Sequence, residues 1–246
     1  MAGPLSCLAA ERLRDQFQDM NYQITIVIPV FNEAGHLGAK LQALQGLRDR
    51  CQLVLVDGGS TDDSPVIAVP WVDKVVHSPR GRATQMNVGA LQADAEILLF
   101  LHADTLLPDN AIDLIRQAVA EGFHWGRFDV TFDNAKPIFK LIAFMMNHRS
   151  RLTGIATGDQ ALFMTRQVFA TVGGFPAMAL MEDIAISSKL KKLGKPCCLN
   201  ANVQTSARRW QQHGLFKTIL LMWRLRLAFF FGADPDDLAM RYYGRK

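Results

Sequence analysis

Two polar residues, His102 and Asp104, follow an apolar run that ends at Leu101. The run predicts a buried strand over 96–101, so the chain delivers an imidazole and a carboxylate to the end of that strand. A divalent cation that bridges two phosphates needs only one or two carboxylates, because phosphate and water complete its coordination. Asp104 can supply one, and His102 is a better ligand for Mn²⁺ than for Mg²⁺. The alternative for His102 is a hydrogen-bonded turn residue.

Acidic residues also follow two other apolar runs. Glu33 comes shortly after the run 24–30, and Asp57 ends the run 52–57 and precedes two glycines. A carboxylate in such a place can accept hydrogen bonds from a nucleobase or a ribose hydroxyl. The alternative for Asp57 is a plain Asp-Gly turn. Neither the G-x-G-x-x-G nor the G-x-x-x-x-G-K-[ST] nucleotide-binding pattern is present.

Charged residues also begin two predicted helices. Arg80 and Arg82 lie just before or at the start of a helix over 82–93, where guanidinium groups and free N–H groups together favour an anion. A solvated surface loop is the alternative. Glu182 and Asp183 begin a helix over 182–194, where acidic residues complement the helix dipole or present a general base. The residues by themselves leave both interpretations open.

The elements that must position these side chains alternate regularly in the first half of the chain. Strands are predicted over 24–30, 52–57, 73–78 and 96–101, and helices over 34–47, 82–93 and 110–122. Apolar strands separated by helices are typical of a parallel sheet covered on both faces, which binds ligands at the carboxyl ends of its strands. The second half predicts strands over 126–132, 158–166 and 195–205, and helices over 137–151, 182–194 and 215–232.

The composition fits one large α/β domain, since 49% of the 246 residues are hydrophobic and disorder is therefore not expected. The four cysteines form no C-x-x-C pair, which favours reduced thiols and a cytoplasmic location. Residues 189–246 contain 12 lysines and arginines but 3 acidic residues. This basic end favours an anionic surface or acceptor, or is a solvated face. No nucleic-acid-binding motif is present, so no nucleic-acid partner is expected.

The domain organisation predicted from the sequence has three parts. We expect an N-terminal extension over 1–20, a single domain over 21–212 and a helical tail over 213–246. No secretory signal is predicted, and no apolar run reaches the roughly 18 residues of a transmembrane helix.

The predicted tail helix, 215–232, carries apolar residues at three- and four-residue steps: Phe216, Leu220, Trp223, Leu227 and Phe230. We expect this stripe to dock on the domain. Exposed Phe229 and Phe231, with the basic residues, would then touch the cytoplasmic face of a membrane, where anionic headgroups attract them. The alternative is a purely structural lid over the acceptor site.

Eight short segments occur in a fixed order between Ile24 and Trp210: IPVFNE, LVLVDGGSTDDS, PRGRATQMNVGA, FLHADT, GDQALFMTR, GGF, MEDI and SARRW. In order and spacing they resemble glycosyltransferase family 2, and within it the short, single-domain bacterial members. The resemblance implies an α/β fold of the GT-A type, with a Rossmann-like, mostly parallel sheet between helices, here followed by a C-terminal helical appendage. It also implies a nucleotide-diphosphate sugar donor, Mg²⁺ or Mn²⁺, and inversion at the anomeric carbon.

The resemblance assigns roles to individual residues. Asp183 matches the catalytic base. Asp104 matches the metal-binding aspartate of an Asp-x-Asp motif whose first aspartate is His102 here. The donor-binding residues would be Pro29, Glu33, Asp57, Arg80, Arg82 and Ala103. The acceptor side would include Gly158, Asp159, Gln160, Glu182, Arg208, Arg209 and Trp210, with positive charge also from Arg149 and Arg151.

The predicted function is therefore metal-dependent, inverting transfer from a UDP- or GDP-sugar to an acceptor that is lipid-linked or anionic. The Gln of the Q-x-x-R-W element found in processive members is absent, so polymer synthesis is not expected. One alternative is a catalytically inactive, membrane-associated protein that binds sugar nucleotides. Another is a nucleotidyltransferase on a similar fold, which would carry a Gly-rich basic loop where Phe31-Asn32-Glu33 stands.

Overall fold

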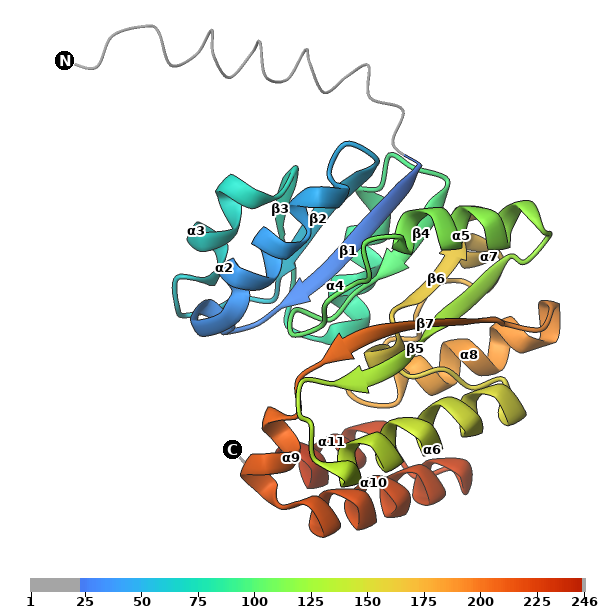
Figure 1. The fold of residues 1–246 in the computed structure, drawn as a ribbon. Helices are drawn as coiled ribbons and strands as arrows, with labels where there is room; N and C mark the ends of the chain where they lie inside the picture. The colour runs from blue at the N-terminus through green and yellow to red at the C-terminus, as the bar shows by residue number, and fades with distance from the viewer. Residues whose placement is uncertain (1–22, 245–246) are drawn as a thin grey trace, which may run out of the picture.

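A seven-stranded sheet forms the centre of the protein in a computed structural model that describes residues 23–244 (Figure 1). The expected extension over 1–20 lies outside the described residues. The strands are β1 Ile24–Val30, β2 Cys51–Asp57, β3 Lys74–His77, β4 Ile97–Phe100, β5 Trp125–Phe132, β6 Leu162–Thr165 and β7 Cys197–Thr205. Their order is β3-β2-β1-β4-β6-β5-β7, and β6 alone runs antiparallel to its neighbours. The predicted mostly parallel α/β sheet is confirmed.

Helices cover both faces of this sheet (Figure 1). One face packs against α2 (Ala34–Ala43) and α5 (Ala111–Ala120), and the other against α4 (Arg82–Leu91), α7 (Arg166–Thr171) and α8 (Glu182–Leu193). The connections contain α3 (Ser64–Ala68) and the 3-10 turns η1 (Gln45–Leu47), η2 (Val69–Trp71) and η3 (Gly158–Gln160). Beyond the β5–β7 edge lie α6 (Pro137–Thr153), α9 (Arg208–His213), α10 (Leu215–Phe230) and α11 (Pro235–Tyr243).

The apolar runs become strands because both of their faces are buried. Every residue of β2 is buried, and β1 sends Ile26 into one core and Val27 into the other. Helix α4 approaches the sheet at Gly89, where a Cβ atom would lie 2.3 Å from Cγ1 of Val27. The glycine therefore lets α4 pack close to β1 and sets the position of the helix's first turn at the sheet edge.

Two predicted elements differ from the structure. The segment 158–166 is not one strand: η3 comes first, and β6 begins after Ala161, whose φ of 48° turns the chain. The predicted helix 34–47 ends at Ala43 and continues as η1. The short helices α3, α7, α9 and α11 were not predicted, because five to nine residues are too few to show a clear helical period.

The orientation predicted for the tail helix α10 is wrong. Thr218 and Leu225 are buried, and Leu221 and Phe229 pack with them or beside α11. The stripe that was expected to dock faces outward instead, with exposed fractions of 59–81% at Leu220, Trp223, Leu227 and Phe230. The helix is apolar on nearly all sides, so its periodicity fits two opposite stripes. Phe231 is exposed as expected, and the side chain of Phe216 lies outside the described part of the chain. No helix within residues 23–244 is both long and apolar enough to cross a bilayer.

Candidate active site

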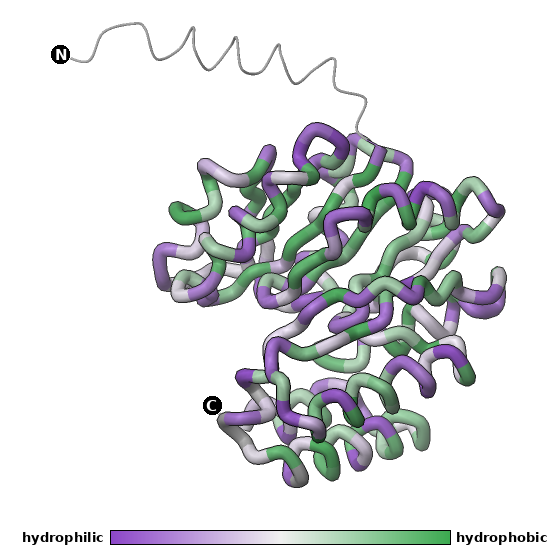
Figure 2. Tube along the Cα trace, in the orientation of Figure 1, coloured by the Kyte–Doolittle hydropathy of each residue, from purple (hydrophilic) through white to green (hydrophobic). Residues whose placement is uncertain are grey.

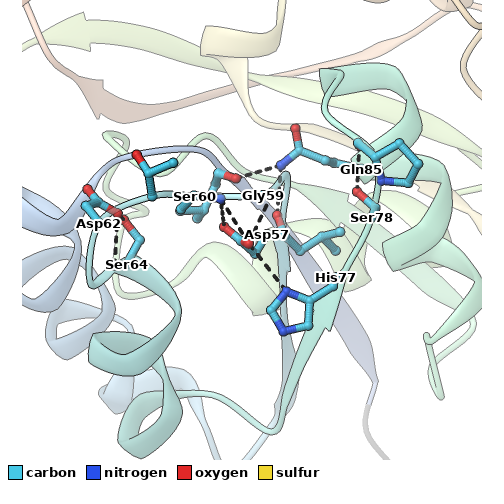
Figure 3. Close-up of polar contacts among 12 residues, drawn as sticks. Asp57, Gly59, Ser60, Asp62, Ser64, His77, Ser78 and Gln85 are labelled. Carbon is cyan, nitrogen blue, oxygen red and sulfur yellow. Dashed lines mark hydrogen bonds and ion pairs between the residues drawn. The ribbon is translucent and has the colours of Figure 1, made fainter.

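Asp57 ends β2 and organises the loop that follows it (Figure 3). Its carboxylate accepts hydrogen bonds from the backbone N–H of Gly59, at 3.1 Å, and of Ser60, at 3.1 and 3.2 Å. Burial raises the pKa of this carboxyl, but hydrogen bonds from Ser60, Gly59 and His77 outweigh burial and lower the pKa overall. Asp57 is therefore an ionised, buried support of the loop, and its expected contact with a nucleoside stays a prediction.

The loop after β1 is tied to the loop after β2. Asn32 adopts a left-handed backbone with φ of 55°, and its side-chain oxygen accepts the N–H of Thr61 at 2.8 Å. The N–H of Asn32 donates to Oγ of Ser60 at 2.9 Å. Next in the chain, Oε2 of Glu33 lies 3.3 Å from Nη2 of Arg208 in α9. This ion pair joins the loop after β1 to α9, the segment that is predicted to lie on the acceptor side.

Gln85 of α4 holds the ends of β1 and β2 together (Figure 3). Its Nε2 donates to the carbonyl oxygens of Val30 and Val56, each at 2.8 Å, and its side chain is buried. A Cβ on Gly58 would lie 2.9 Å from Cδ of Gln85, so the glycine makes room for this amide. The sequence reasoning missed Gln85. Its only signal is an amide on the same helix face as Met86 and other buried apolar residues.

Arg82 and Glu182 pair across the site. Nη1 of Arg82, at the start of α4, lies 3.3 Å from Oε1 of Glu182, at the start of α8. The Glu182 side chain is 3% exposed and that of Arg82 is 38% exposed. Burial lowers the pKa of Arg82, but the negative charge of Glu182 and of neighbouring groups raises it overall. Glu182 therefore has two roles: it is the buried ion-pair partner of Arg82, and it is an acidic residue in the first turn of α8.

Asp183 follows Glu182 and has a pKa close to neutrality. Its Oδ2 accepts the N–H of Gly158 at 3.0 Å, and its Oδ1 accepts the N–H of Ile184 at 2.7 Å. Burial, and then the negative charge of Glu182, raise the pKa of Asp183 to about 6, although these hydrogen bonds and Arg82 act to lower it. A carboxylate with a pKa near the working pH is suited to general-base chemistry.

His102 lies against the turn that contains Gly158. A Cβ on Gly158 would come within 2.3 Å of Nε2 of His102, so only glycine allows this contact. Nδ1 of His102 lies 3.3 Å from Oδ1 of Asp159. Nε2 is buried and has no hydrogen-bond partner among residues 23–244. The ring thus faces the 158–159 turn, and its role as a metal ligand stays a prediction.

Asp104 lies in a loop that is anchored to β7. The hydroxyl of Thr105 donates to Oδ1 of Asp104 at 3.3 Å and lies 3.3 Å from the hydroxyl of Thr205. Within the described residues, no group of three or more His, Cys, Asp or Glu side chains is arranged to hold a metal ion. A hard divalent cation at Asp104 would need oxygen ligands from phosphate and water. That donor set suits Mg²⁺ or Mn²⁺ bound to a diphosphate.

The other residues predicted to bind the donor differ in how deeply they are buried. Pro29 lies inside β1, in register with Val56, and Ala103 is partly buried against the core. Arg80 is exposed, and its guanidinium lies 4.0 Å from the centre of the Phe31 ring. Arg80 is therefore held at the surface beside the loop after β1, where a cation–π contact orients it.

The acceptor-side residues divide into two kinds. Gly158 and Asp159 lie beside Asp183 and His102, as described above. Gln160 is completely buried, and its Oε1 accepts the N–H of Thr157 at 3.2 Å, so it supports the turn from inside. Trp210 packs edge-on against Phe132 with ring centres 6.0 Å apart. The contacts expected between these residues and an acceptor stay predictions. The side chain of Arg209 lies outside the described part of the chain.

Residues that are far apart in the sequence thus form one site at the carboxyl ends of the strands. Arg82, Glu182 and Asp183 meet the Gly158 turn and His102 there. Glu182, Asp183, Gly158 and His102 line a cavity of about 10 Å³, together with Met86, Phe100, Leu162 and Phe175. Such a cavity holds about one water molecule. The arrangement combines a cation, which favours an anionic group, with a carboxylate that can take up a proton.

The chain belongs to glycosyltransferase family 2, since residues 25–175, more than half of its length, match the model of the family described as glycosyl transferase family 2. The family inferred from the motifs is confirmed. This chain is 30% identical over 112 residues to an undecaprenyl-phosphate 4-deoxy-4-formamido-L-arabinose transferase of Pseudomonas savastanoi pv. phaseolicola. The match covers 41% of this chain and 33% of that protein. It is 31% identical over 117 residues to an uncharacterized glycosyltransferase of Mycobacterium bovis, covering 42% and 52%. The matches thus span a third to about half of the length of these relatives.

Solved structures share the fold. A mannosyltransferase from Pyrobaculum calidifontis, in complex with GDP-Man and Mn²⁺, aligns with a TM-score of 0.62 at 21% identity over 90% of this chain and 68% of that one. S. aureus TarS in complex with UDP-GlcNAc aligns with a TM-score of 0.62 at 16% identity, over 75% and 58%. At these identities the likeness shows the fold, which is the one that the motifs implied.

Proposed function

We propose that this protein transfers a sugar from a nucleotide-diphosphate sugar to an acceptor hydroxyl, with inversion at the anomeric carbon. The observation that carries the proposal is the Asp183 carboxylate. It occupies the position that matches the family's catalytic base, two backbone N–H groups hold it, and its pKa is raised to about 6. Membership of glycosyltransferase family 2 supports the reaction class.

In the proposed step, Asp183 accepts the proton of the acceptor hydroxyl. The hydroxyl oxygen forms a bond to C1 of the sugar, while the bond between C1 and the diphosphate oxygen breaks and its electron pair leaves with the nucleoside diphosphate. A single displacement of this kind inverts C1. With a pKa of about 6, Asp183 is mostly ionised at neutral pH and can act as the base. Arg82, which pairs with Glu182 beside Asp183, would stabilise the negative charge of the leaving diphosphate.

The proposed donor is a UDP- or GDP-sugar, held by the loops after β1 and β2 and by Arg80 and Arg82. Fold neighbours solved with GDP-Man and with UDP-GlcNAc support this class of donor. The proposed cation is Mg²⁺ or Mn²⁺ at Asp104, with His102 as a second candidate ligand. When bound, the cation would neutralise part of the diphosphate charge.

The proposed acceptor is lipid-linked or anionic, and transfer to it is non-processive because the Gln of the processive element is absent. The name of one relative, which includes undecaprenyl phosphate, supports a lipid-linked acceptor.

Peripheral contact with an anionic membrane surface would bring the enzyme to such an acceptor. Helices α6 and α10 share a small apolar core, and neither contains an acidic residue (Figure 1). Both also expose large apolar side chains, among them Phe144 at 63% and Trp223 at 64%. Figure 2 shows that hydrophobic residues recur along both helices. Exposed aromatic residues on acid-free basic helices are suited to an anionic bilayer interface. The contact would therefore involve the outward stripe of α10 that contains Trp223.

A panel of UDP- and GDP-sugars with Mn²⁺ tests the function. The correct donor should raise the melting temperature of the wild-type protein through mass action, and mass spectrometry of the products should then show sugar transfer or slow donor hydrolysis. Asp183→Asn should bind the donor and fail to turn it over. Binding without turnover by the wild-type protein would instead favour an inactive sugar-nucleotide-binding protein. Release of pyrophosphate from a nucleoside triphosphate and a sugar phosphate would favour nucleotidyl transfer.

A further inference from the structure

The arginines of the acceptor side differ in whether they are paired. Nη2 of Arg151 in α6 lies 2.6 Å from Asp129 and 2.6 Å from Oδ1 of Asn200. Arg208 pairs with Glu33. Both guanidinium groups thus already have a carboxylate partner, and that of Arg151 is shared with Arg127.

Arg149 is different, although it lies on the same helix as Arg151. Its Nε and Nη2 atoms are buried and have no hydrogen-bond partner among residues 23–244. Burial lowers the pKa of Arg149, and the charges of Asp183 and Asp159 offset this only in part. Buried guanidinium N–H groups are rarely left without an acceptor, because an unmade hydrogen bond to a charged group is costly. Two nitrogen atoms of the Arg149 guanidinium are thus buried without an acceptor from the described residues.

The unpaired guanidinium belongs to the surroundings of the proposed base. The negative charges that act on Arg149 are those of Asp183 and Asp159, and both residues contact the turn at Gly158 or His102. Nε2 of His102 is a second buried polar atom without a described partner beside that turn. Buried polar atoms without a partner among the described residues therefore occur both on α6 and in the loop after β4, and the charged residues of this turn act on both.

The geometry of inversion decides which substrate this cation serves. In an in-line displacement, the acceptor approaches C1 from the side opposite the departing diphosphate. The expected diphosphate position is beside Arg82 and Asp104, at α4 and the loop after β4. Arg149 comes from α6, in the other half of the chain, and the charge of Asp183 acts on both Arg149 and Arg82. We therefore expect a group bound by Arg149 on the acceptor's side of the base.

We infer that Arg149 binds an anionic group of the acceptor, a phosphate or a carboxylate, and so places the acceptor hydroxyl beside Asp183. The inference rests on the proposed function. A guanidinium offers its Nε and Nη2 hydrogens in parallel to two oxygens of one such group, which matches the two atoms that lack partners. The recognised chemistry is the acidic group itself, whether a lipid headgroup or a soluble molecule carries it.

Inorganic phosphate is the probe for this subsite. Its binding to the full-length protein is measured by calorimetry and by thermal shift, with and without saturating UDP and Mn²⁺, so that the donor site is filled in one arm. Wild type should bind phosphate in both arms. Arg149→Met should bind it about tenfold more weakly or worse, the usual effect of losing a charge-assisted hydrogen bond. Arg149→Lys should keep part of the affinity, and Lys140→Met, which removes an exposed cation of the same helix, should behave as wild type.

The outcomes separate this inference from the proposed function. Unchanged phosphate binding by Arg149→Met, or no phosphate binding by wild type, would overturn the inference. Loss of UDP binding by Arg149→Met with phosphate binding intact would place Arg149 at the donor and overturn it as well. If no nucleotide or nucleotide sugar binds wild type, the proposed function fails, while the phosphate arm without UDP still decides whether Arg149 holds an anion. With phosphatidic acid vesicles in place of phosphate, binding that also depends on Arg149 would identify a lipid source, and its absence a soluble one.

Discussion

Replacing Asp183 with asparagine should make the protein a poorer enzyme and a more stable one at alkaline pH. The amide keeps the shape of the side chain but cannot accept the proton of the acceptor hydroxyl. Turnover should therefore fall by about 10²-fold or more, the usual contribution of a positioned general base. In the wild-type protein, kcat/KM should rise with pH and level off above a pKa of about 6, because only the ionised carboxylate is active. The variant should lose this dependence.

The gain in stability follows from the same pKa. The carboxyl ionises at 3.8 in its ordinary state but at about 6 in the folded protein. Between these values the folded state binds more protons than the unfolded state, so the free energy of unfolding falls as pH rises. The gap corresponds to about 3 kcal/mol of destabilisation, fully present above the folded pKa of about 6 and absent below the ordinary value of 3.8. Asparagine removes this cost but loses one acceptor oxygen, worth about 1 kcal/mol. The net gain at pH 8 should be about 1–2 kcal/mol.

Urea unfolding at pH 8 and pH 4 measures this gain, together with steady-state kinetics. At pH 8 the free energy of unfolding of Asp183→Asn should exceed that of wild type by about 1–2 kcal/mol, and at pH 4 it should not. The matched control is Asp113→Asn, because Asp113 is an exposed carboxylate paired with Arg50, and it should change neither stability nor turnover appreciably. Near-normal turnover of Asp183→Asn would refute the role of base. A variant less stable than wild type at pH 8 would refute the raised pKa.

Four further changes test other parts of the site. Asp104→Ala should abolish Mn²⁺-dependent binding of UDP in calorimetry, and retained binding would place the metal elsewhere. His102→Ala should weaken Mn²⁺ more than Mg²⁺ if the imidazole is a ligand, whereas equal loss would leave it a turn residue. Gln85→Met removes the amide donor that the carbonyls of Val30 and Val56 share, although the Val30 carbonyl also accepts the N–H of Gly58, and should lower the free energy of unfolding by about 1–3 kcal/mol in urea; an unchanged free energy of unfolding would contradict the bridge. Trp223→Ser should reduce flotation with anionic vesicles at low salt, while Leu91→Ser, an 81% exposed control on α4, should not; no flotation of wild type would exclude the membrane contact.

The sequence by itself determined the framework of this protein. Apolar runs such as 24–30 and 52–57, separated by helices, are typical of strands in a parallel sheet whose two faces are both covered by helices. Their periodicity and spacing are local properties, so β1, β2 and β4 and the polar residues at their ends could be predicted. The glycines after Asp57 marked the loop where we expect the donor, and the order of the motifs indicated the family before any contact was known.

The tertiary structure alone decided which of these residues meet and in what state. Arg82 and Glu182 are 100 positions apart, and nothing local to either shows that they pair or that burial beside Glu182 raises the pKa of Asp183. Arg149 and Arg151 look alike in sequence, and only packing buries Nε and Nη2 of the first without a partner among the described residues and pairs the second with Asp129. Helix α10 is apolar on both sides, so its sequence fits two orientations. Its orientation is decided by the side chains of α11 and of the start of α8, which pack against one face of α10. A periodic pattern describes the faces of a helix but not the surface that will cover them.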